Sequence, residues 1–167
     1  MKVILAKTAG FCPGVKRAVD LVYQEAGKGS VYTFGPIIHN EAVVEDLKDK
    51  GVKVAESIDD IPEDPKTTVV IRSHGVSKKT SEAIAAKGVH VLDATCPFVK
   101  KIHRIVMEKG SEGREIIIIG DPQHPEVEAI CGWCDREPTV IENVGQAAAF
   151  VPKWSEKLCV VSPSIIT

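Results

Sequence analysis

The stretch GFCPGVKRA at residues 10–18 returns in altered form as ATCPFVKKI at residues 94–102. In both copies a Cys-Pro pair is followed, one residue on, by Val-Lys, and Cys12 and Cys96 lie 84 residues apart. Self-similarity at a fixed offset is the first sign of a repeated structural unit. The two stretches therefore suggest that the chain is built from two copies of one module.

A second pair of motifs supports the same offset. GPIIHNEAV at residues 35–43 corresponds to GDPQHPEVE at residues 120–128, with the two histidines 85 residues apart and a glutamate two residues after each. We therefore predict two tandem repeats, the first over residues 1–95 and the second over residues 96–167. The second repeat is the shorter and is expected to be cut short at its C-terminal end.

Short β-branched runs alternate with amphipathic stretches along the whole chain. This alternation is typical of α/β units with mainly parallel strands, so we predict tandem α/β repeats with mainly parallel sheets. Strands are expected near residues 3–6, 31–34, 52–55, 67–72, 89–92, 115–119, 139–141 and 158–161, and helices near 15–26, 41–50, 77–87 and 97–110.

Composition and charge exclude several classes of protein. The chain has 167 residues, a net charge of −2 and 44% hydrophobic residues, which is enough for an ordinary globular core. Such a balance lacks the basic surface that nucleic-acid binding needs. Its longest aliphatic run, residues 116–119, is far too short to span a membrane. We therefore expect a cytoplasmic protein without a nucleic-acid or membrane partner.

Two of the five cysteines occupy equivalent and chemically favourable positions. An odd number of cysteines without a secretion signal favours reduced thiols over a disulfide framework. Cys12 and Cys96 each follow a predicted strand and precede a helix, with Pro13 and Pro97 at the first helical position. A helix N-terminus favours negative charge on a thiol, which suits a metal ligand or a nucleophile. The alternative is that each cysteine merely fills a turn.

Three histidines follow strand ends beside glycines. His39, His74 and His124 lie near Gly35, Gly75 and Gly120, and ligands of parallel sheets gather at the carboxyl ends of strands. Such a cluster would suit an anionic group such as phosphate. Glu126 lies two residues after His124 and is a candidate proton donor if burial raises its pKa. The competing interpretation is that these are ordinary loop histidines and an exposed glutamate at a helix start.

The other cysteines and histidines have less specific settings. CGWC at residues 131–134 matches a Cys-x-x-Cys redox pattern, but it ends a predicted helix, whereas a redox motif normally opens one. A thiol oxidoreductase therefore remains a third possibility. Cys159 lies in an apolar strand and should be buried and inert. His90 and His103 are expected to be surface or packing residues.

Five motifs taken together resemble a known family. GFCPGVKRAV, GPIIHN, RSHGV, DATCP and HPEVE occur in the order and spacing of the 4-hydroxy-3-methylbut-2-enyl diphosphate reductases, the LytB/IspH family of iron–sulfur oxidoreductases in the non-mevalonate pathway of isoprenoid biosynthesis. The resemblance implies a three-fold pseudo-symmetric arrangement of α/β repeats around a 4Fe-4S cluster. It also implies that Cys12 and Cys96 are two of the three metal ligands.

The resemblance further implies the roles of the other site residues. His39, His74, His124 and Ser164 are expected to bind the substrate diphosphate and surround its hydroxyl, and Glu126 is expected to deliver the catalytic proton. The family reaction removes an allylic hydroxyl with two electrons and two protons, giving isopentenyl and dimethylallyl diphosphate. An electron donor such as ferredoxin or flavodoxin would be a partner.

The chain also departs from the family pattern. The third repeat, which in the family supplies the third cysteine, is missing, and the chain reads SPSI at residues 162–165 where the family reads Ser-Gln-Thr-Thr. These features are expected of a truncated reductase with little or no turnover by itself. The alternative function is a non-catalytic module of two repeats that binds diphosphate or a metal weakly.

Overall fold

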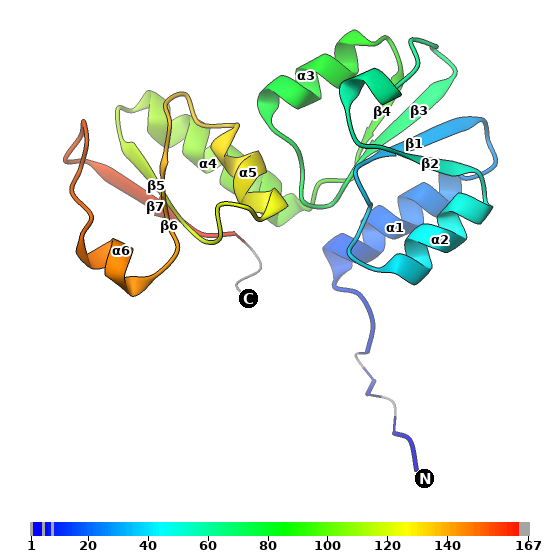
Figure 1. The fold of residues 1–167 in the computed structure, drawn as a ribbon, viewed down its shortest axis with the longest axis horizontal. Coiled ribbons are helices and arrows are strands. Elements are labelled where there is room, and N and C mark those ends of the chain that lie inside the picture. The colour runs from blue at the N-terminus through cyan, green and yellow to red at the C-terminus, as the bar shows by residue number, and fades with distance from the viewer. Residues whose placement is uncertain (1, 5, 8, 164–167) are drawn as a thin grey trace.

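The computed structural model describes residues 2–4, 6–7 and 9–163 of the chain. Helices alternate with strands throughout, and the described elements form two groups in sequence order (Figure 1). The first group is α1 (Pro13–Glu25), β1 (Ser30–Phe34), α2 (Glu41–Asp49), β2 (Val52–Ala55), the short 3₁₀ helix η1 (Ile58–Asp60), β3 (Thr67–Ile71), α3 (Lys78–Ala86) and β4 (His90–Asp93). The second group is α4 (Pro97–Ser111), β5 (Glu115–Ile119), α5 (Pro125–Cys131), β6 (Thr139–Ile141), α6 (Val144–Ala148) and β7 (Leu158–Val161).

Each group builds one parallel sheet, and the two sheets have the same strand order. The first sheet runs β2-β1-β3-β4 and the second runs β6-β5-β7. All pairings in both sheets are parallel. If α1 corresponds to α4 and β1 to β5, then β2 corresponds to β6 and β3 to β7. The order β2-β1-β3 of the first sheet is then the order β6-β5-β7 of the second. The predicted fold class of tandem α/β repeats is therefore confirmed.

Local sequence signals explain where the helices begin. Pro13 and Pro97 occupy the first position of α1 and α4, where a missing N–H costs nothing. Asn40 and Ser77 cap α2 and α3 by accepting hydrogen bonds from backbone N–H groups in the first turn. Asn143 caps α6 in the same way, and this short helix is one that the sequence analysis does not predict.

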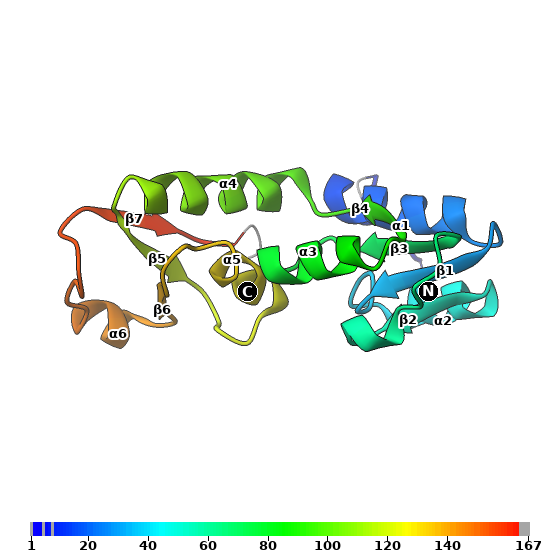
Figure 2. The ribbon, with the colours of Figure 1, turned by 90° about the horizontal axis from the view of Figure 1, so that it is seen from above.

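Helices cover both faces of the first sheet. One apolar cluster, which includes Val22, Leu47 and Val70, lies under α1 and α2. A second cluster on the other face includes Val69 and Ile84 and lies under α3. In the second repeat one cluster is formed beneath α4 and α5. Figure 2 shows α1 and α4 on the same side of the molecule, with the two repeats placed end to end.

The second sheet lacks an equivalent of α3 and β4 among the described residues. Sheet register pairs Tyr32 with Val69 in the first repeat and Ile117 with Val160 in the second. Val69 is 0% exposed because α3 covers it, whereas Val160 is 60% exposed. This face of the second sheet is thus open at β7, whereas Ile117 in the neighbouring strand β5 is only 3% exposed.

The strand predicted over residues 3–6 is not formed at residues 3, 4 and 6, the positions of this range that the structure describes. The described residues before α1 belong to no strand or helix, and Val3 and Ile4 are exposed. An apolar run becomes a strand only where a neighbouring strand accepts its backbone hydrogen bonds, and Figure 1 shows this segment leading away from both sheets. The apolar side chains in this range favour a strand, but a local sequence pattern carries no information about whether a neighbouring strand is available.

Candidate functional site

Strand ends position the three predicted histidines. His74 follows β3 by three residues, and His39 lies in the loop after β1, just before the cap of α2. His124 follows β5 and is itself the N-cap of α5. Because β1 and β3 are parallel neighbours, their carboxyl ends open at one edge of the first sheet. The end of β5 brings the third histidine from the second repeat.

The three rings lie against one another and form what we call the histidine cluster. The ring centroid of His74 is 5.1 Å from that of His39 and 5.7 Å from that of His124. His39 is exposed, His124 is half-buried and His74 is only 7% exposed. Two repeats thus contribute to one group of imidazoles, with His74 at its centre.

Electrostatics keep the central ring neutral. Burial, together with repulsion from His39, Arg72 and His124, lowers the pKa of His74 to about 4. Its Nδ1 is buried without a hydrogen-bond partner among the described residues. At neutral pH, His74 therefore offers unused hydrogen-bonding capacity without a charge, and an anion bound beside it would favour its protonation.

Arg72 is a cation beside the cluster that the sequence analysis missed. Its guanidinium occupies the space where Gly35 would carry a Cβ, since that atom would lie 2.7 Å from Nη1. Gly35 has a φ of +68°, so both its backbone and this close approach require glycine. The signal was present in the sequence, because Arg72 is the first residue after β3.

The capping role of His124 fixes its tautomer. Its Nδ1 accepts a hydrogen bond from the backbone N–H of Glu126 at 3.2 Å. A neutral ring that accepts at Nδ1 carries its proton on Nε2 and can donate it to a ligand. Glu126 itself is buried, with 1% of its surface exposed, and its role as proton donor stays a prediction.

Of the two predicted metal-binding cysteines, Cys96 lies against the first turn of α1, the helix that Cys12 caps. Cys12 and Cys96 are the N-caps of α1 and α4, and neither side chain makes a capping hydrogen bond. A Cβ on Gly14, in the first turn of α1, would lie 2.6 Å from the Cys96 Sγ. The backbone N–H of Cys96 donates to the carbonyl of Ser73 at 2.9 Å, directly beside His74. The fold thus brings one thiol of the second repeat against the helix that the other thiol caps.

The described residues supply only part of a cluster site. Among them, no group of three or more histidine, cysteine or acidic side chains is arranged to hold a metal. An iron–sulfur cluster is held by three or four thiolates, and Cys12 and Cys96 offer two. Cys12 and Cys96 could therefore provide two of the three or four thiolates, and the described part of the chain does not provide the others.

The remaining cysteines are unsuited to redox chemistry. Cys131, Cys134 and Cys159 all pack against the core of the second repeat. Burial raises the pKa of Cys131 and Cys159, and raises that of Cys134 to about 12, whereas a reactive thiol has a lowered pKa. The hypothesis of a thiol oxidoreductase is therefore wrong for this pair. Cys159 is only partly buried, not fully buried as predicted, because its strand lies at the open edge of the sheet.

Three predicted positions remain outside the site or outside the described residues. Ser164 lies beyond the described residues, so its role stays a prediction. His90 is exposed on β4, and His103 is a packing residue, stacked on Trp133. The described helices include none with the length and apolar character that crossing a bilayer demands.

Comparison with known proteins gives a consistent result. The family model described as LytB protein matches residues 3–164. A 4-hydroxy-3-methylbut-2-enyl diphosphate reductase of Thermoanaerobacter sp. is 47% identical over 99% of this chain, and one of Clostridioides difficile is 40% identical over 99%. The chain covers 58% and 60% of these two relatives.

Solved structures show the same likeness. One match is the structure of (E)-4-hydroxy-3-methyl-but-2-enyl diphosphate reductase, the terminal enzyme of the non-mevalonate pathway. Its TM-score is 0.81 and its sequence identity is 37%, and the match covers 99% of this chain and 59% of the reductase chain. The corresponding reductase from Plasmodium falciparum matches with a TM-score of 0.88 and 30% identity, covering 96% and 50%. Since the family model matches nearly the whole length, this chain belongs to the LytB protein family.

Proposed function

We propose that the chain provides two repeats of a 4-hydroxy-3-methylbut-2-enyl diphosphate reductase. The observation that carries the proposal is the histidine cluster, in which both repeats contribute rings within 5.1 and 5.7 Å of His74. The reaction removes the allylic hydroxyl with two electrons and two protons, and it yields isopentenyl and dimethylallyl diphosphate. Electrons would come from a cytoplasmic donor such as ferredoxin or flavodoxin.

The histidine cluster and Arg72 would bind the diphosphate. Arg72 supplies a permanent positive charge beside His74, and the Nε2–H of His124 is free of the capping bond made by Nδ1. Because His74 is neutral when no anion is present, an anion that binds beside it would raise its pKa and draw a proton into the site. The cluster would thus gain positive charge only when the substrate is bound.

Glu126 would deliver a proton to the leaving hydroxyl. It is buried, and its backbone N–H is bonded to the ring of His124, so a ligand held by His124 would lie close to the carboxyl group. A hydroxyl leaves more easily as water than as hydroxide, which is why a positioned acid accelerates the C–O cleavage. Replacement of Glu126 by glutamine should leave diphosphate binding intact and remove proton delivery.

Cys12 and Cys96 would be two of the ligands of the 4Fe-4S cluster. Such a cluster, when bound, passes electrons to the substrate and can act as a Lewis acid through an iron that lacks a protein ligand. The contribution of this chain is the pair of thiols at two adjoining helix N-termini. None of the residues outside the described ranges is a cysteine, and Cys131, Cys134 and Cys159 pack in the second repeat, so a further thiol would have to come from a longer form of the chain or from another chain.

Binding of inorganic pyrophosphate to the 167-residue chain tests the anion site. Titration calorimetry should show at least about tenfold weaker binding for His74→Gln and for His124→Gln, since each loses a hydrogen bond to a charged group. His90→Gln, at an exposed histidine outside the cluster, is the matched control and should bind as the parent does. Pyrophosphate affinity that is indifferent to both cluster substitutions would contradict the proposal.

One observation favours a second function for these residues taken alone. Because the described part of the chain offers two thiols and no complete metal site, it is suited to bind the diphosphate without reducing the substrate. A chain of this kind would bind pyrophosphate but show little turnover. The two functions therefore share the binding experiment and differ in the assay of the reaction.

A further inference from the structure

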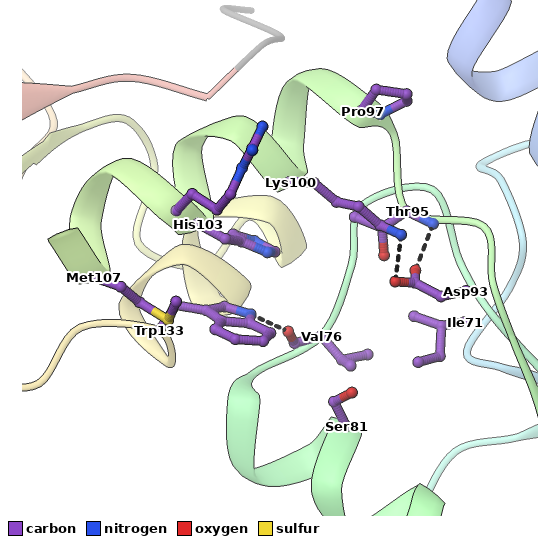
Figure 3. Close-up of a pocket in the computed structure, with 11 residues that line it drawn as sticks. Ile71, Val76, Ser81, Asp93, Thr95, Pro97, Lys100, His103, Met107 and Trp133 are labelled. Carbon is purple, nitrogen blue, oxygen red and sulfur yellow. Dashed lines mark hydrogen bonds and ion pairs between the residues drawn. The ribbon is translucent and has the colours of Figure 1, made fainter.

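A pocket of about 360 Å³ lies at the junction of the two repeats (Figure 3). The first repeat lines it with residues at the end of β3 and in α3, and the second repeat with α4 and Trp133. Neither the cluster histidines nor Glu126, Cys12 or Cys96 belong to its lining. Its volume falls in the range of small-molecule sites, and the proposed reductase chemistry does not use it.

The aromatic wall of the pocket is fixed by both repeats. The indole N–H of Trp133 donates to the carbonyl of Val76 at 2.8 Å, across the junction. The indole also stacks on His103, with ring centroids 5.2 Å apart and an angle of 17° between the planes. Since its only polar atom is satisfied by Val76, Trp133 presents a rigid apolar surface. Ile71 and Met107 extend this apolar lining.

His103 leaves hydrogen-bonding capacity unused in the same wall. The residue is 6% exposed, and its Nε2 is buried without a hydrogen-bond partner among the described residues. Burial lowers the pKa of His103 to about 4, so the ring is neutral at physiological pH. Buried polar atoms are normally paired, and an unpaired one in a pocket wall indicates a place for a ligand or water.

The charges around the pocket favour an anion. Lys100 and Asp93 form an ion pair of 2.6 Å across it, and these two charges cancel (Figure 3). Arg104 lies one helical turn after Lys100 and also lines the pocket. No ion pair or hydrogen bond to Arg104 is found within the described portion of the chain. With His103 neutral and the Lys100–Asp93 pair compensated, the exposed Arg104 is the one uncompensated positive charge among the lining residues that the structure describes.

We propose that this pocket binds a small organic anion whose flat apolar body lies against Trp133 and Met107 and whose anionic group pairs with Arg104. The apolar walls select for the body, and the guanidinium selects for the charge. None of its lining residues is one that we assign to the diphosphate site. Because Thr95 and Pro97 both line the pocket, an occupant would contact the segment that joins the repeats on either side of Cys96.

A set of three probes tests the chemistry of recognition. Titration calorimetry of the full chain with 1-naphthylacetate should give saturable binding with a Kd on the order of 1 mM or below, as expected for a ligand of this size. The uncharged 1-naphthylacetamide should bind at least about tenfold more weakly, because it cannot form the ion pair. Acetate, which lacks the apolar body, should show no binding. Equal affinities for the naphthyl acid and its amide would overturn the proposal.

Substitutions then locate the site. Arg104→Gln should weaken 1-naphthylacetate binding about tenfold, whereas Lys101→Gln removes a neighbouring exposed charge on α4 that does not line the pocket and should change nothing. Ser81→Trp fills the pocket from α3 and should abolish binding. His74→Gln should leave it intact. Binding that survives both Arg104→Gln and Ser81→Trp, or that is lost with His74→Gln, would place the anion elsewhere and refute the assignment.

Discussion

Substitution of Gly14 by alanine should move the Cys96 thiol without unfolding the protein. An added Cβ would lie 2.6 Å from the Cys96 Sγ and 3.3 Å from its Cβ. Ordinary contact between such atoms requires about 3.5–4.0 Å, so the thiol or the helix must shift by about 1 Å. The Cys96 backbone is held by two hydrogen bonds of 2.9 Å, one to Ser73 and one from Lys100, so the side chain is the part that can turn.

The cost of overpacking in Gly14→Ala is partly offset by the higher helix propensity of alanine. Overpacking of this kind costs about 1–3 kcal/mol, whereas alanine in a helix is favoured over glycine by about 1 kcal/mol. The net loss of stability should therefore be no more than about 2 kcal/mol. Gly110→Ala is a matched control, because its Cβ in α4 would meet its nearest neighbour, an oxygen of Asp135, at 3.7 Å. This control should be neutral or slightly stabilising.

Two assays report the position of the thiol. The bifunctional thiol reagent dibromobimane should bridge Cys12 and Cys96 in the parent chain, as identified by mass spectrometry of the linked peptides, because Cys96 contacts the first turn of the helix that Cys12 caps. Anaerobic reconstitution with iron, sulfide and added thiol should give absorption near 400 nm. Gly14→Ala should reduce both signals several-fold and Gly110→Ala should reduce neither. If Gly14→Ala bridges and reconstitutes like the parent, the inferred closeness of the thiols is wrong.

Three further predictions concern stability and activity. Val69→Ala should lower the free energy of unfolding, measured by urea titration, by about 2–3 kcal/mol. Val160→Ala, at the equivalent position that is 60% exposed, should lower it by less than about 1 kcal/mol. Equal losses would mean that Val160 is covered. In the folded chain the pKa values of His74 and His103 are about 4, so between about pH 6.5 and pH 4 the unfolded chain binds more protons at these two residues. The free energy of unfolding should therefore fall as the pH falls, by up to about 1.4 kcal/mol per histidine for each pH unit. The double variant with phenylalanine at both positions should lose this slope and His90→Phe should keep it; a double variant with the parent's slope would assign it to other groups. With a strong reductant, the 167-residue chain should turn over the hydroxymethylbutenyl diphosphate much more slowly than a longer family member that carries a third cysteine. Equal rates in the same assay would show that two repeats suffice.

The sequence predicted most of the fold because its signals are local and occur twice. Cys-Pro at the start of α1 and α4, and the equivalent histidines after β1 and β5, are enough to define the repeat and its offset. The strand over residues 3–6 failed for the opposite reason, since a strand depends on a neighbour that no local pattern reports. Arg72 follows β3 directly, which is the one signal that the sequence offered, but its packing beside Gly35 joins positions that are distant in sequence and no local pattern reports it.

The shared site also explains why neither repeat is expected to act by itself. His39 and His74 belong to the first repeat, but His124, which supplies a ring against His74, belongs to the second. The backbone of Cys96 bonds to Ser73, so the first residue capping the second repeat is held by the strand end that carries His74. A change in how the repeats pack would therefore separate both the imidazoles and the thiols at once. Trp133→Phe removes the hydrogen bond to Val76 across the junction but retains an aromatic ring, and it should weaken pyrophosphate binding severalfold because the relative position of the two repeats sets the spacing of the histidine cluster. Calorimetry with the parent and this variant measures the effect, and an unchanged affinity would show that the repeats hold their relative position without this contact.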